Sequence, residues 1–349
     1  MREIKIGDKT VGEGKPCFII AEAGVNHNGD INLAKRLIDV AKEAGADAVK
    51  FQTFKAEELV TADAGKAQYQ KETTDAKESQ FEMLRKLELT ESDFEELFNY
   101  AQKKGIIFLS SPFDKRSVDL LDKLGVPAFK IPSGEITDFP LLRHIATKGK
   151  PIILSTGMAT LGEIEEALEV IRKEGVEEIV LLHCVSCYPA KIEDTNLKAM
   201  DTLRYAFNLP VGLSDHSLGV SIPVAAVALG ACVIEKHFTL DKNLPGPDHR
   251  ASLEPDELKE MVRAIRDIEK ALGDGIKRPT EEEEENKKVG RRSIVARVDI
   301  PRGAIITEEM LTMKRPSGGI EPRHIKMIVG RKAREHIRSE EPITFTKVV

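Results

Sequence analysis

Short apolar runs alternate with segments of helical periodicity through the first three quarters of the chain, and this pattern restricts the fold more than any other feature. Most of the runs are continuously apolar, which is typical of strands buried on both faces. Eight such runs are found, at residues 17–23, 48–52, 106–111, 128–133, 152–156, 179–184, 211–215 and 232–238. Helical spacing occupies residues 32–44, 91–104, 115–124, 139–148, 161–174, 197–207, 219–230 and 255–272. A strand–helix unit repeated eight times predicts a closed (β/α)8 barrel, a TIM barrel. A doubly wound open sheet is the competing fold, but no Gly-x-Gly-x-x-Gly pattern follows the first strand.

The barrel domain is expected to span residues 1–272 and to carry two additions. Residues 4–11 have the pattern of a β-hairpin with Gly-Asp at the turn, and this hairpin would plug the bottom of the barrel. Residues 54–90 are too many for an ordinary loop between a strand and a helix. We expect them to form a lid or a partner surface.

The chain changes character after residue 272. Residues 273–289 are interpreted as a linker, because Gly273 and Gly275 break the helix and residues 281–285 form a solvated acidic run. Residues 290–349 contain short β-like pieces at 293–298, 305–306 and 343–348 among prolines and glycines. They predict a small, mostly irregular second domain. About sixty residues bury too little surface to be very stable alone, so we expect this domain to dock on a barrel.

Polar residues stand at the end of nearly every predicted strand. The carboxyl ends of barrel strands meet at one face, where barrel enzymes carry their active sites. The residues at these ends are Glu22, Lys50, Gln52, Ser110, Ser111, Lys130, Ser133, Ser155, Thr156, His183, Ser186, Tyr188, Ser214, His216, Glu235 and His237. A single one would be unremarkable as a cap or an interior residue. Eight strand ends in succession indicate an active site.

Two of these residues, His216 and His237, follow the last two predicted strands at equivalent places. Parallel neighbouring strands bring both imidazoles to the same edge, where they can bind one divalent cation together with water and substrate. A pair of partly buried histidines with ordinary structural partners is the alternative.

Two lysines at strand ends indicate an anionic ligand. Lys50 and Lys130, with the hydroxyl groups of Ser133, Ser155 and Ser214, form a plausible phosphate pocket. Ion pairs between these lysines and Glu22 or Glu235 are the structural alternative. A Schiff-base aldolase at Lys130 is the alternative in mechanism.

Composition limits the remaining classes of function. A net charge of −6 without a basic run argues against nucleic-acid binding. No signal peptide opens the sequence, and its longest apolar stretch is too short to span a membrane. Four cysteines make no disulfide framework, and the Cys184-x-x-Cys187 spacing lacks the helix of a redox motif. We expect a cytoplasmic protein with no nucleic-acid or membrane partner.

Seven motifs on the predicted strand ends and loops together resemble the sialic acid synthase family. They are IAEAGVNHNG (20–29), VKFQ (49–52), KIPSGE (130–135), LSTGM (154–158), GLSDHS (212–217), EKHFT (235–239) and PGPD (245–248). The C-terminal part, with GRRS (290–293) and KRP (314–316), resembles that family's antifreeze-like (SAF) domain. Ice binding itself is not expected, because the domain carries too many charged residues, among them Arg323 and Lys326.

This resemblance implies a condensation of phosphoenolpyruvate with open-chain N-acetylmannosamine to give N-acetylneuraminate, with C–O cleavage and release of phosphate. Manganese, or magnesium or cobalt in its place, would be held by His216 and His237. Glu22 and Glu235 would be the catalytic carboxylates. The residues implied for phosphoenolpyruvate are Lys50, Ser111, Lys130, Ser133, Ser155 and Ser214. Those implied for the sugar are Gln52, Tyr188, Asp248 and Arg315, the last delivered across a domain-swapped homodimer.

Two features point to a different acceptor sugar. Ser186 stands where some bacterial members of the family have asparagine, and residues 249–252 are closer to legionaminate synthases. The alternative is therefore an N,N'-diacetyllegionaminate or pseudaminate synthase that uses a 2,4-diacetamido-2,4,6-trideoxy sugar.

Overall fold

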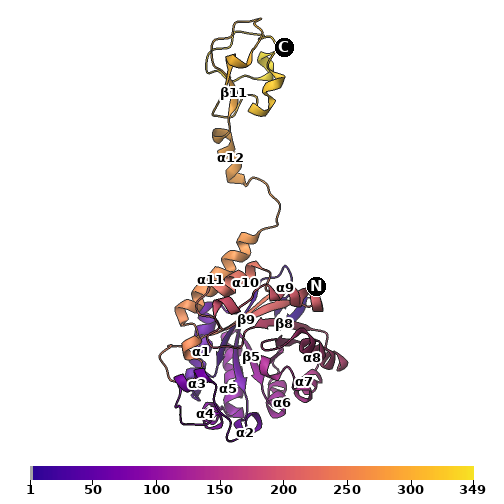
Figure 1. Ribbon diagram of the computed structural model, residues 1–349. Helices are drawn as coiled ribbons and strands as arrows, with labels where there is room; N and C mark the ends of the chain where they lie inside the picture. Colours follow the sequence, from indigo (N-terminus) through magenta and orange to yellow (C-terminus); the bar gives the residue numbers. More distant parts are fainter. Residues whose placement is uncertain (1–2) are drawn as a thin grey trace. The chain divides into compact units, whose positions relative to one another are not determined.

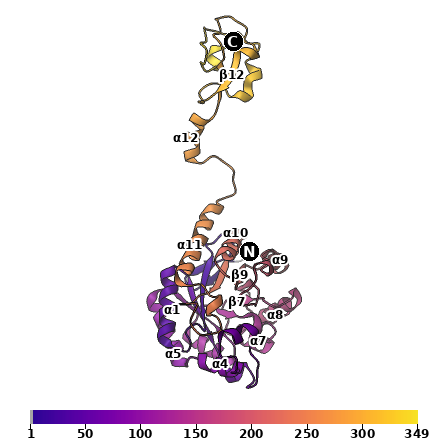
Figure 2. The same cartoon turned by 60° about the vertical axis from the view of Figure 1, so that its left-hand side comes forward.

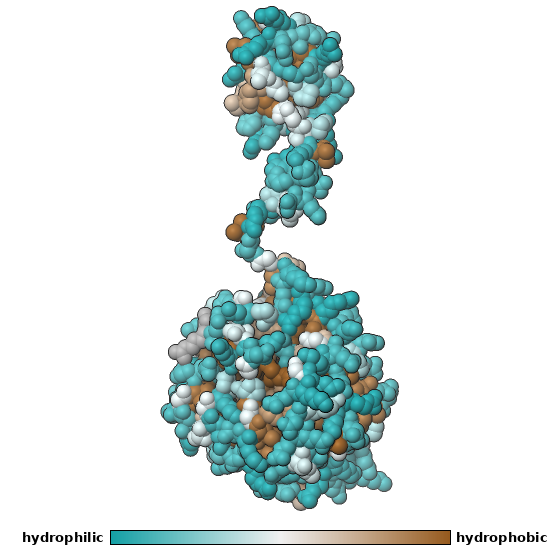
Figure 3. All heavy atoms as spheres, turned by 180° about the vertical axis from the view of Figure 1, so that it is seen from behind, coloured by the Kyte–Doolittle hydropathy of each residue, from teal (hydrophilic) through white to brown (hydrophobic). Residues whose placement is uncertain are grey.

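The structure is a computed structural model, and it describes residues 3–349. The chain divides into two compact units, Met1–Gly273 and Asp274–Val349. None of the helices in the described residues is long and apolar enough to cross a membrane. Seen from behind, the surface of each unit is mainly hydrophilic with small scattered hydrophobic areas (Figure 3), as expected of a chain with 32% charged residues.

The first unit is built around one sheet of eight parallel strands (Figure 1). The strands are β3 (Phe18–Gly24), β4 (Ala48–Thr53), β5 (Ile107–Pro112), β6 (Phe129–Ile131), β7 (Ile152–Ser155), β8 (Ile179–Cys184), β9 (Val211–Asp215) and β10 (Val233–His237). Their order is β5-β4-β3-β10-β9-β8-β7-β6. Because β5 and β6, at the two ends of this order, also lie against each other, the sheet curls into a nearly closed barrel. The predicted TIM barrel is confirmed.

Helices surround the strands on the outside of the barrel (Figures 1 and 2). They are α1 (Ile31–Ala44), α5 (Glu91–Lys104), α6 (Lys115–Leu124), α7 (Phe139–Ala146), α8 (Leu161–Lys173), α9 (Ala199–Phe207), α10 (Ser221–Ala228) and α11 (Pro255–Leu272). Local sequence sets their ends. In α1, for example, Asp30 accepts a hydrogen bond from the N–H of Asn32, and Gly45 ends the helix in the left-handed conformation. Short 3₁₀ helices follow some strands, at η1 (Ser133–Glu135), η2 (Ile192–Asp194) and η3 (His249–Ala251).

Alternation along the strands separates an outer core from an inner one. Outward-facing residues such as Ile19, Val49 and Phe129 pack under the helices. Inward-facing residues such as Ile20 and Ala48 fill the barrel interior. Because successive side chains alternate, the next inward positions on each strand lie directly above this inner core. Those positions are where the polar strand-end residues stand.

A β-hairpin closes the bottom of the barrel, as predicted. Strands β1 (Ile4–Ile6) and β2 (Lys9–Val11) pair antiparallel around Gly7, whose φ of 62° suits the turn. The side chains of Ile4, Ile6 and Val11 are buried in the inner core. The hairpin therefore completes the packing of the barrel interior from below.

The long insertion between β4 and α5 folds into three short helices, α2 (Ala56–Leu59), α3 (Gln68–Thr73) and α4 (Gln80–Leu87). It has an apolar cluster of its own, in which Met83 and Leu87 of α4 pack with Val25 and Phe54. The insertion is thus a structured part of the barrel unit.

The second unit begins with a helix that the sequence interpretation missed. Residues 281–290 form α12 (Glu281–Gly290), within the segment expected to be a solvated linker. Thr280 and Glu283 form a capping box, in which each side chain accepts the other's backbone N–H. The acidic run stands in the first turn, where negative charge is favourable. No residue of the helix is buried, so it is solvated as expected, but it is not irregular.

The rest of this unit is small and mostly irregular, as predicted. It has one antiparallel pair, β11 (Ser293–Ala296) with β12 (Leu311–Lys314), and three 3₁₀ helices, η4 (Glu308–Met310), η5 (Pro322–Met327) and η6 (Phe345–Lys347). The prediction missed β12. It also proposed strands at 305–306 and 343–348, where the structure has isolated bridges such as Ile305 with Lys332 and, within the second range, the 3₁₀ helix η6. Ile294, Ile300, Ile328 and Ile337 are fully buried in the centre of this unit.

Candidate active site

Two lysines and two glutamates form a buried charge network at the top of the inner core. The nitrogen of Lys50 lies 2.7 Å from Glu22 Oε2 and 3.7 Å from Glu235 Oε2. The nitrogen of Lys130 lies 3.0 Å from Glu235 Oε1. All four side chains are almost completely buried. The predicted lysines therefore meet both predicted carboxylates, which means that the ion-pair alternative also describes the ligand-free site.

The two carboxylates differ in how easily they ionise. Burial raises the pKa of Glu22 to about 7, although Lys50 acts in the opposite direction. Burial also opposes ionisation of Glu235, but Lys130 and Lys50 outweigh it and hold the pKa of Glu235 at about 2. Burial lowers the pKa of Lys130, and the carboxylate of Glu235 counteracts this only in part. A pair of carboxyl groups with separated pKa values is an arrangement suited to proton transfer.

Two of the predicted serines bond directly to this network, and two others stand at the ends of β6 and β7. Lys50 donates a hydrogen bond to Ser111 Oγ (3.0 Å), and Ser214 donates one to Glu235 Oε1 (3.0 Å). Ser133 Oγ accepts the N–H of Gly157 (2.9 Å). The hydroxyl of Ser155 is buried and has no hydrogen-bond partner among the described residues. A buried donor without a partner is costly, and Ser155 is therefore available to a ligand beside the two lysines.

The imidazoles of His216 and His237 face each other, with ring centroids 5.2 Å apart. Nδ1 of His216 is hydrogen-bonded to the carbonyl oxygen of Val185 (2.8 Å), which leaves its Nε2 for another partner. Nδ1 of His237 is buried and has no hydrogen-bond partner among the described residues. Burial lowers the pKa of His237 well below its ordinary value, so this ring is neutral. Burial also acts to lower the pKa of His216, but its contacts with Cys184 and with the carbonyl oxygen of Val185 outweigh burial and raise that pKa. In their neutral forms, the two buried imidazoles fit a divalent metal ion.

The described residues offer this ion no group of three or more His, Cys, Asp or Glu ligands. The histidine pair could thus supply two ligands, and the remaining ones would come from water or substrate. A metal ion held by this histidine pair stays a prediction.

Gln52, Tyr188 and Asp248, three of the four residues predicted for the sugar, lie on the imidazole side of the network. Asp248 Oδ2 is 3.7 Å from Nδ1 of His237, and burial raises the pKa of Asp248 to about 6. A Cβ atom placed on Gly24 would be 3.3 to 3.7 Å from side-chain atoms of Glu22, Gln52 and Asp248, so these three groups converge around a glycine. The Tyr188 ring lies 4.1 Å from that of His216, between centroids.

The structure also turns some strand-end residues away from this site. Ser110 is hydrogen-bonded to Thr53 (2.7 Å), Thr156 donates to the carbonyl oxygen of Leu182 (2.9 Å), and His183 is bonded to that of Thr195 (2.7 Å).

Two further residues named in the sequence analysis have other places. Arg315 belongs to the second unit, directly after β12. Ser186 packs beside Gly157, where a Cβ would lie only 2.3 Å from its hydroxyl oxygen.

Sequence reasoning missed two residues of this region. Asn26 is buried, donates to the carbonyl oxygen of Phe238 (2.8 Å) and to Ser252 Oγ (2.9 Å), and leaves its own carbonyl oxygen without a hydrogen-bond partner. Asn26 stands within the first quoted motif, so its position could have been noticed. Tyr69 comes from α3 of the insertion and stacks on Tyr188, with centroids 5.2 Å apart. No local pattern distinguishes Tyr69 in the sequence.

Comparison with protein families finds two matches in the chain. The model of the NeuB family matches residues 37–277, and that of the SAF domain matches residues 291–349. The first match covers most of the barrel unit and the second covers nearly all of the small domain.

Individual relatives extend over almost the whole chain. An N,N'-diacetyllegionaminic acid synthase of Campylobacter jejuni subsp. jejuni serotype O:2 is 55% identical over 331 residues, which are 94% of this chain and 99% of that one. A protein of the same name from Legionella pneumophila subsp. pneumophila is 52% identical, covering 93% of this chain and 92% of that one. The crystal structure of the N-acetylneuraminic acid synthetase from Leptospira borgpetersenii serovar Hardjo-bovis, in complex with citrate, is 41% identical. It superimposes with a TM-score of 0.73 and covers 82% of this chain and 95% of that one.

Proposed function

Because this chain belongs to the NeuB family, we propose that it condenses phosphoenolpyruvate with an open-chain 2,4-diacetamido-2,4,6-trideoxy sugar to give N,N'-diacetyllegionaminate. The observation that carries the proposal is the buried network of Lys50, Lys130, Glu22 and Glu235 beside the two facing imidazoles of His216 and His237. It combines an anion pocket with groups able to move protons.

The choice of sugar replaces the main expectation from the sequence. N-acetylmannosamine was expected first and the diacetamido sugar second. The relatives named as diacetyllegionaminic acid synthases are 55% and 52% identical to this chain, whereas the sialic acid synthetase is 41% identical. These identities support the alternative.

The lysine side of the site suits phosphoenolpyruvate. The phosphate and carboxylate groups of phosphoenolpyruvate would lie among Lys50, Lys130, Ser111, Ser133, Ser155 and Ser214. Lys130 faces the carboxylate of Glu235, and we therefore assign its ammonium group to anion binding rather than to a Schiff base. Ser155 contributes a hydroxyl that has no other hydrogen-bond partner in the described residues.

The reaction balances with one molecule of water. Carbon 3 of phosphoenolpyruvate attacks the sugar aldehyde and forms the new C–C bond. Water adds to carbon 2, and the C–O bond to phosphate breaks, so that inorganic phosphate leaves. Glu22, whose pKa of about 7 lies near neutrality, is suited to exchange the protons of the aldehyde oxygen and the attacking water. Glu235, whose pKa of about 2 keeps it ionised near neutral pH, holds the two lysines in place.

The other end of the site would hold the sugar through Gln52, Tyr188 and Asp248. His216 and His237 would hold a divalent ion, with Mn²⁺ as first choice and Mg²⁺ or Co²⁺ as alternatives, which when bound supplies Lewis-acid polarisation of the aldehyde. Gln52 and Asp248 converge with Glu22 around Gly24, so the sugar and the proton-transfer group would be in contact.

The choice of sugar is tested by competition between acceptors. With saturating phosphoenolpyruvate, kcat/KM should be at least about tenfold higher for the diacetamido sugar than for N-acetylmannosamine, which corresponds to about 1.4 kcal/mol. Release of inorganic phosphate measures both rates. A tenfold preference for N-acetylmannosamine would restore the first expectation.

The small domain is proposed to act on a neighbouring subunit. About sixty residues make a weakly stable unit by themselves, and the segment that precedes them contains the solvated helix α12. We propose a domain-swapped homodimer in which Arg315 completes the partner's sugar site. Mixed dimers of inactive His237→Ala and inactive Arg315→Ala subunits should then recover part of the activity. Verified mixed dimers without any recovery would place Arg315 in its own subunit's site or outside both.

A further inference from the structure

Two tyrosine rings, those of Tyr188 and Tyr69, continue in a row from the proposed metal-binding histidines. The ring of Tyr188 contacts His216, with centroids 4.1 Å apart, and lies edge-on to His237 at 5.6 Å. The ring of Tyr69 stacks on the other end of this row, 5.2 Å from Tyr188 at an interplanar angle of 27°. Tyr69 is therefore one ring farther from the imidazoles than Tyr188.

Tyr69 also lies on the sugar side of the site rather than on the lysine side. Burial raises the pKa of Tyr69, and the carboxylate of Asp248 is the next cause of that shift. Asp248 is the group that approaches His237 and Gln52. The half-buried Tyr69 thus stands near the residues proposed to bind the sugar, and part of its side chain remains open to solvent.

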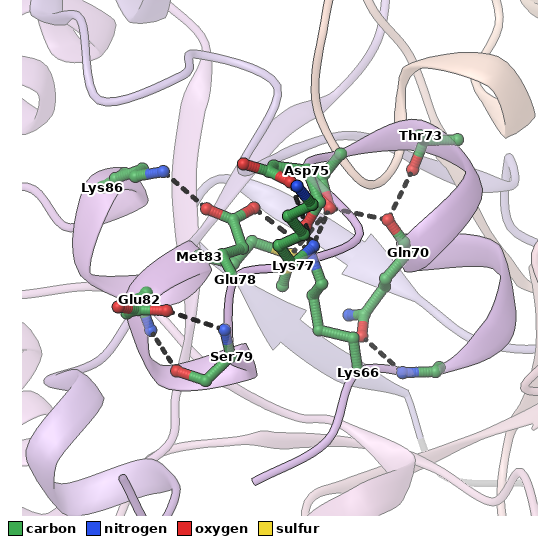
Figure 4. A network of polar contacts seen from close by, with 12 residues as sticks. Lys66, Gln70, Thr73, Asp75, Lys77, Glu78, Ser79, Glu82, Met83 and Lys86 are labelled. Atoms are coloured by element: carbon green, nitrogen blue, oxygen red, sulfur yellow. Dashed lines mark hydrogen bonds and ion pairs between the residues drawn. The ribbon is translucent and has the colours of Figure 1, made fainter. Parts of the chain in front are cut away.

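A buried lysine holds the helix that carries Tyr69. Lys66, which precedes α3, donates to Thr74 Oγ1 (2.7 Å) and to the carbonyl oxygen of Asp75, and it pairs with Glu78 at 3.2 Å. These bonds tie the two ends of α3 together, as Figure 4 shows. The side chain of Lys66 is only 1% exposed, so its charge depends on these partners.

Further bonds within the insertion lie next to the contacts of Lys66 with Thr74, Asp75 and Glu78, which we call the clasp. The side chain of Gln70 accepts the N–H of Ala67 (3.0 Å) and closes the first turn of α3. Glu78, which precedes α4, pairs with Lys86 as well as with Lys66 (Figure 4). Six isolated residues do not form a stable helix in water. The clasp and the apolar cluster around Met83 therefore fix the position of Tyr69.

We propose that Tyr69 is a specificity-determining residue, whose ring forms the outer wall of the acceptor site against the sugar carbons farthest from the aldehyde. This inference rests on the proposed function and names what selects the sugar. If the aldehyde lies at the imidazoles and the sugar extends along the row of rings, its distal carbons meet Tyr69.

An aromatic wall favours one acceptor over the other. The methyl group at carbon 6 and the acetamido methyl at carbon 4 of the diacetamido sugar can pack on a ring face. N-acetylmannosamine has hydroxyl groups at both carbons. A ring face gives them no comparable hydrogen bond, so they lose water without compensation. Tyr69 should therefore contribute to selectivity and leave phosphoenolpyruvate binding unaffected.

Substitution of Tyr69 tests this role. Tyr69→Ala should lower kcat/KM for the diacetamido sugar by about tenfold and reduce its advantage over N-acetylmannosamine by a similar factor. KM for phosphoenolpyruvate should stay within about twofold. Tyr69→Phe keeps the ring and should keep the selectivity. Tyr205→Ala is the matched control, because that tyrosine is 85% exposed on α9 and should change neither sugar.

Lys66→Met tests the clasp separately. It should reproduce the loss of selectivity of Tyr69→Ala without touching the site, and thermal unfolding should show that the barrel remains folded. Unchanged selectivity in folded Tyr69→Ala, or an equal loss for both sugars, would overturn the role of Tyr69. Unchanged selectivity in folded Lys66→Met would overturn the role of the clasp. A wild-type enzyme that releases no phosphate with either sugar would instead reject the proposed function itself.

Discussion

Replacing His237 by alanine is expected to lower kcat/KM by about a thousandfold or more while the barrel stays folded. His237 is buried, neutral and without a hydrogen-bond partner for Nδ1 in the described residues, so its removal takes away a candidate metal ligand and few structural contacts. Residues at the top of a barrel serve chemistry more than stability. His216→Ala should behave alike, and metal analysis of both variants should show loss of bound manganese.

His183→Ala is the control for this prediction. His183 also stands at the end of a strand, but it is bonded to the carbonyl oxygen of Thr195 and belongs to the set turned away from the site. We expect its kcat/KM to remain within about threefold of the wild type. In parallel, EDTA should inactivate the wild type and added manganese should restore it. Full activity of the chelated, metal-free enzyme would show that the histidines have another role.

Replacing Lys130 by alanine is expected to raise KM for phosphoenolpyruvate by about a hundredfold. The substitution removes one of the two lysines of the charge network, leaves the carboxylate of Glu235 with the more distant Lys50, and takes away a partner of the ligand's anionic groups. Because a charged pair is broken in the interior, the free energy of unfolding should also fall, by about 3 kcal/mol. Initial rates and urea unfolding measure the two effects.

Lys236→Ala separates binding from stability. Lys236 is as buried as Lys130 and directly follows Glu235 in β10. Its side chain faces away from the barrel interior and pairs with Asp215. This variant should lose about as much stability as Lys130→Ala and keep its KM for phosphoenolpyruvate. If both variants raised KM equally, Lys130 would have to be regarded as a structural residue.

The barrel and much of the site could be predicted because they depend on local alternation. Runs such as β8 (Ile179–Cys184) and β9 (Val211–Asp215) have the predicted bounds. Once the strands are placed, inward positions such as Lys50 and Glu235 follow from the period of two. The strand ends could not show which polar residue faces inward when two are adjacent. Ser110 and Ser111 are an example, since only Ser111 contacts Lys50.

The remaining errors have separate physical causes. Helix α12 was missed because the acidic run was interpreted as a solvated linker, although Thr280 and Glu283 form a capping box at its start. Strand β12 was missed because Leu311–Lys314 is short and lies at the edge of an irregular unit. Tyr69 was missed because its place depends on the tertiary clasp of Lys66 and not on its neighbours in the sequence.

The central claim, condensation with C–O cleavage, is tested most directly by an isotope measurement. Phosphoenolpyruvate labelled with oxygen-18 in the bridging position is supplied together with the 2,4-diacetamido-2,4,6-trideoxy sugar and manganese. If water adds to carbon 2, the label should leave entirely with inorganic phosphate, and a nine-carbon sugar acid without label should accumulate in equal amount. Retention of the label in the sugar acid would mean cleavage of the P–O bond and would contradict the account.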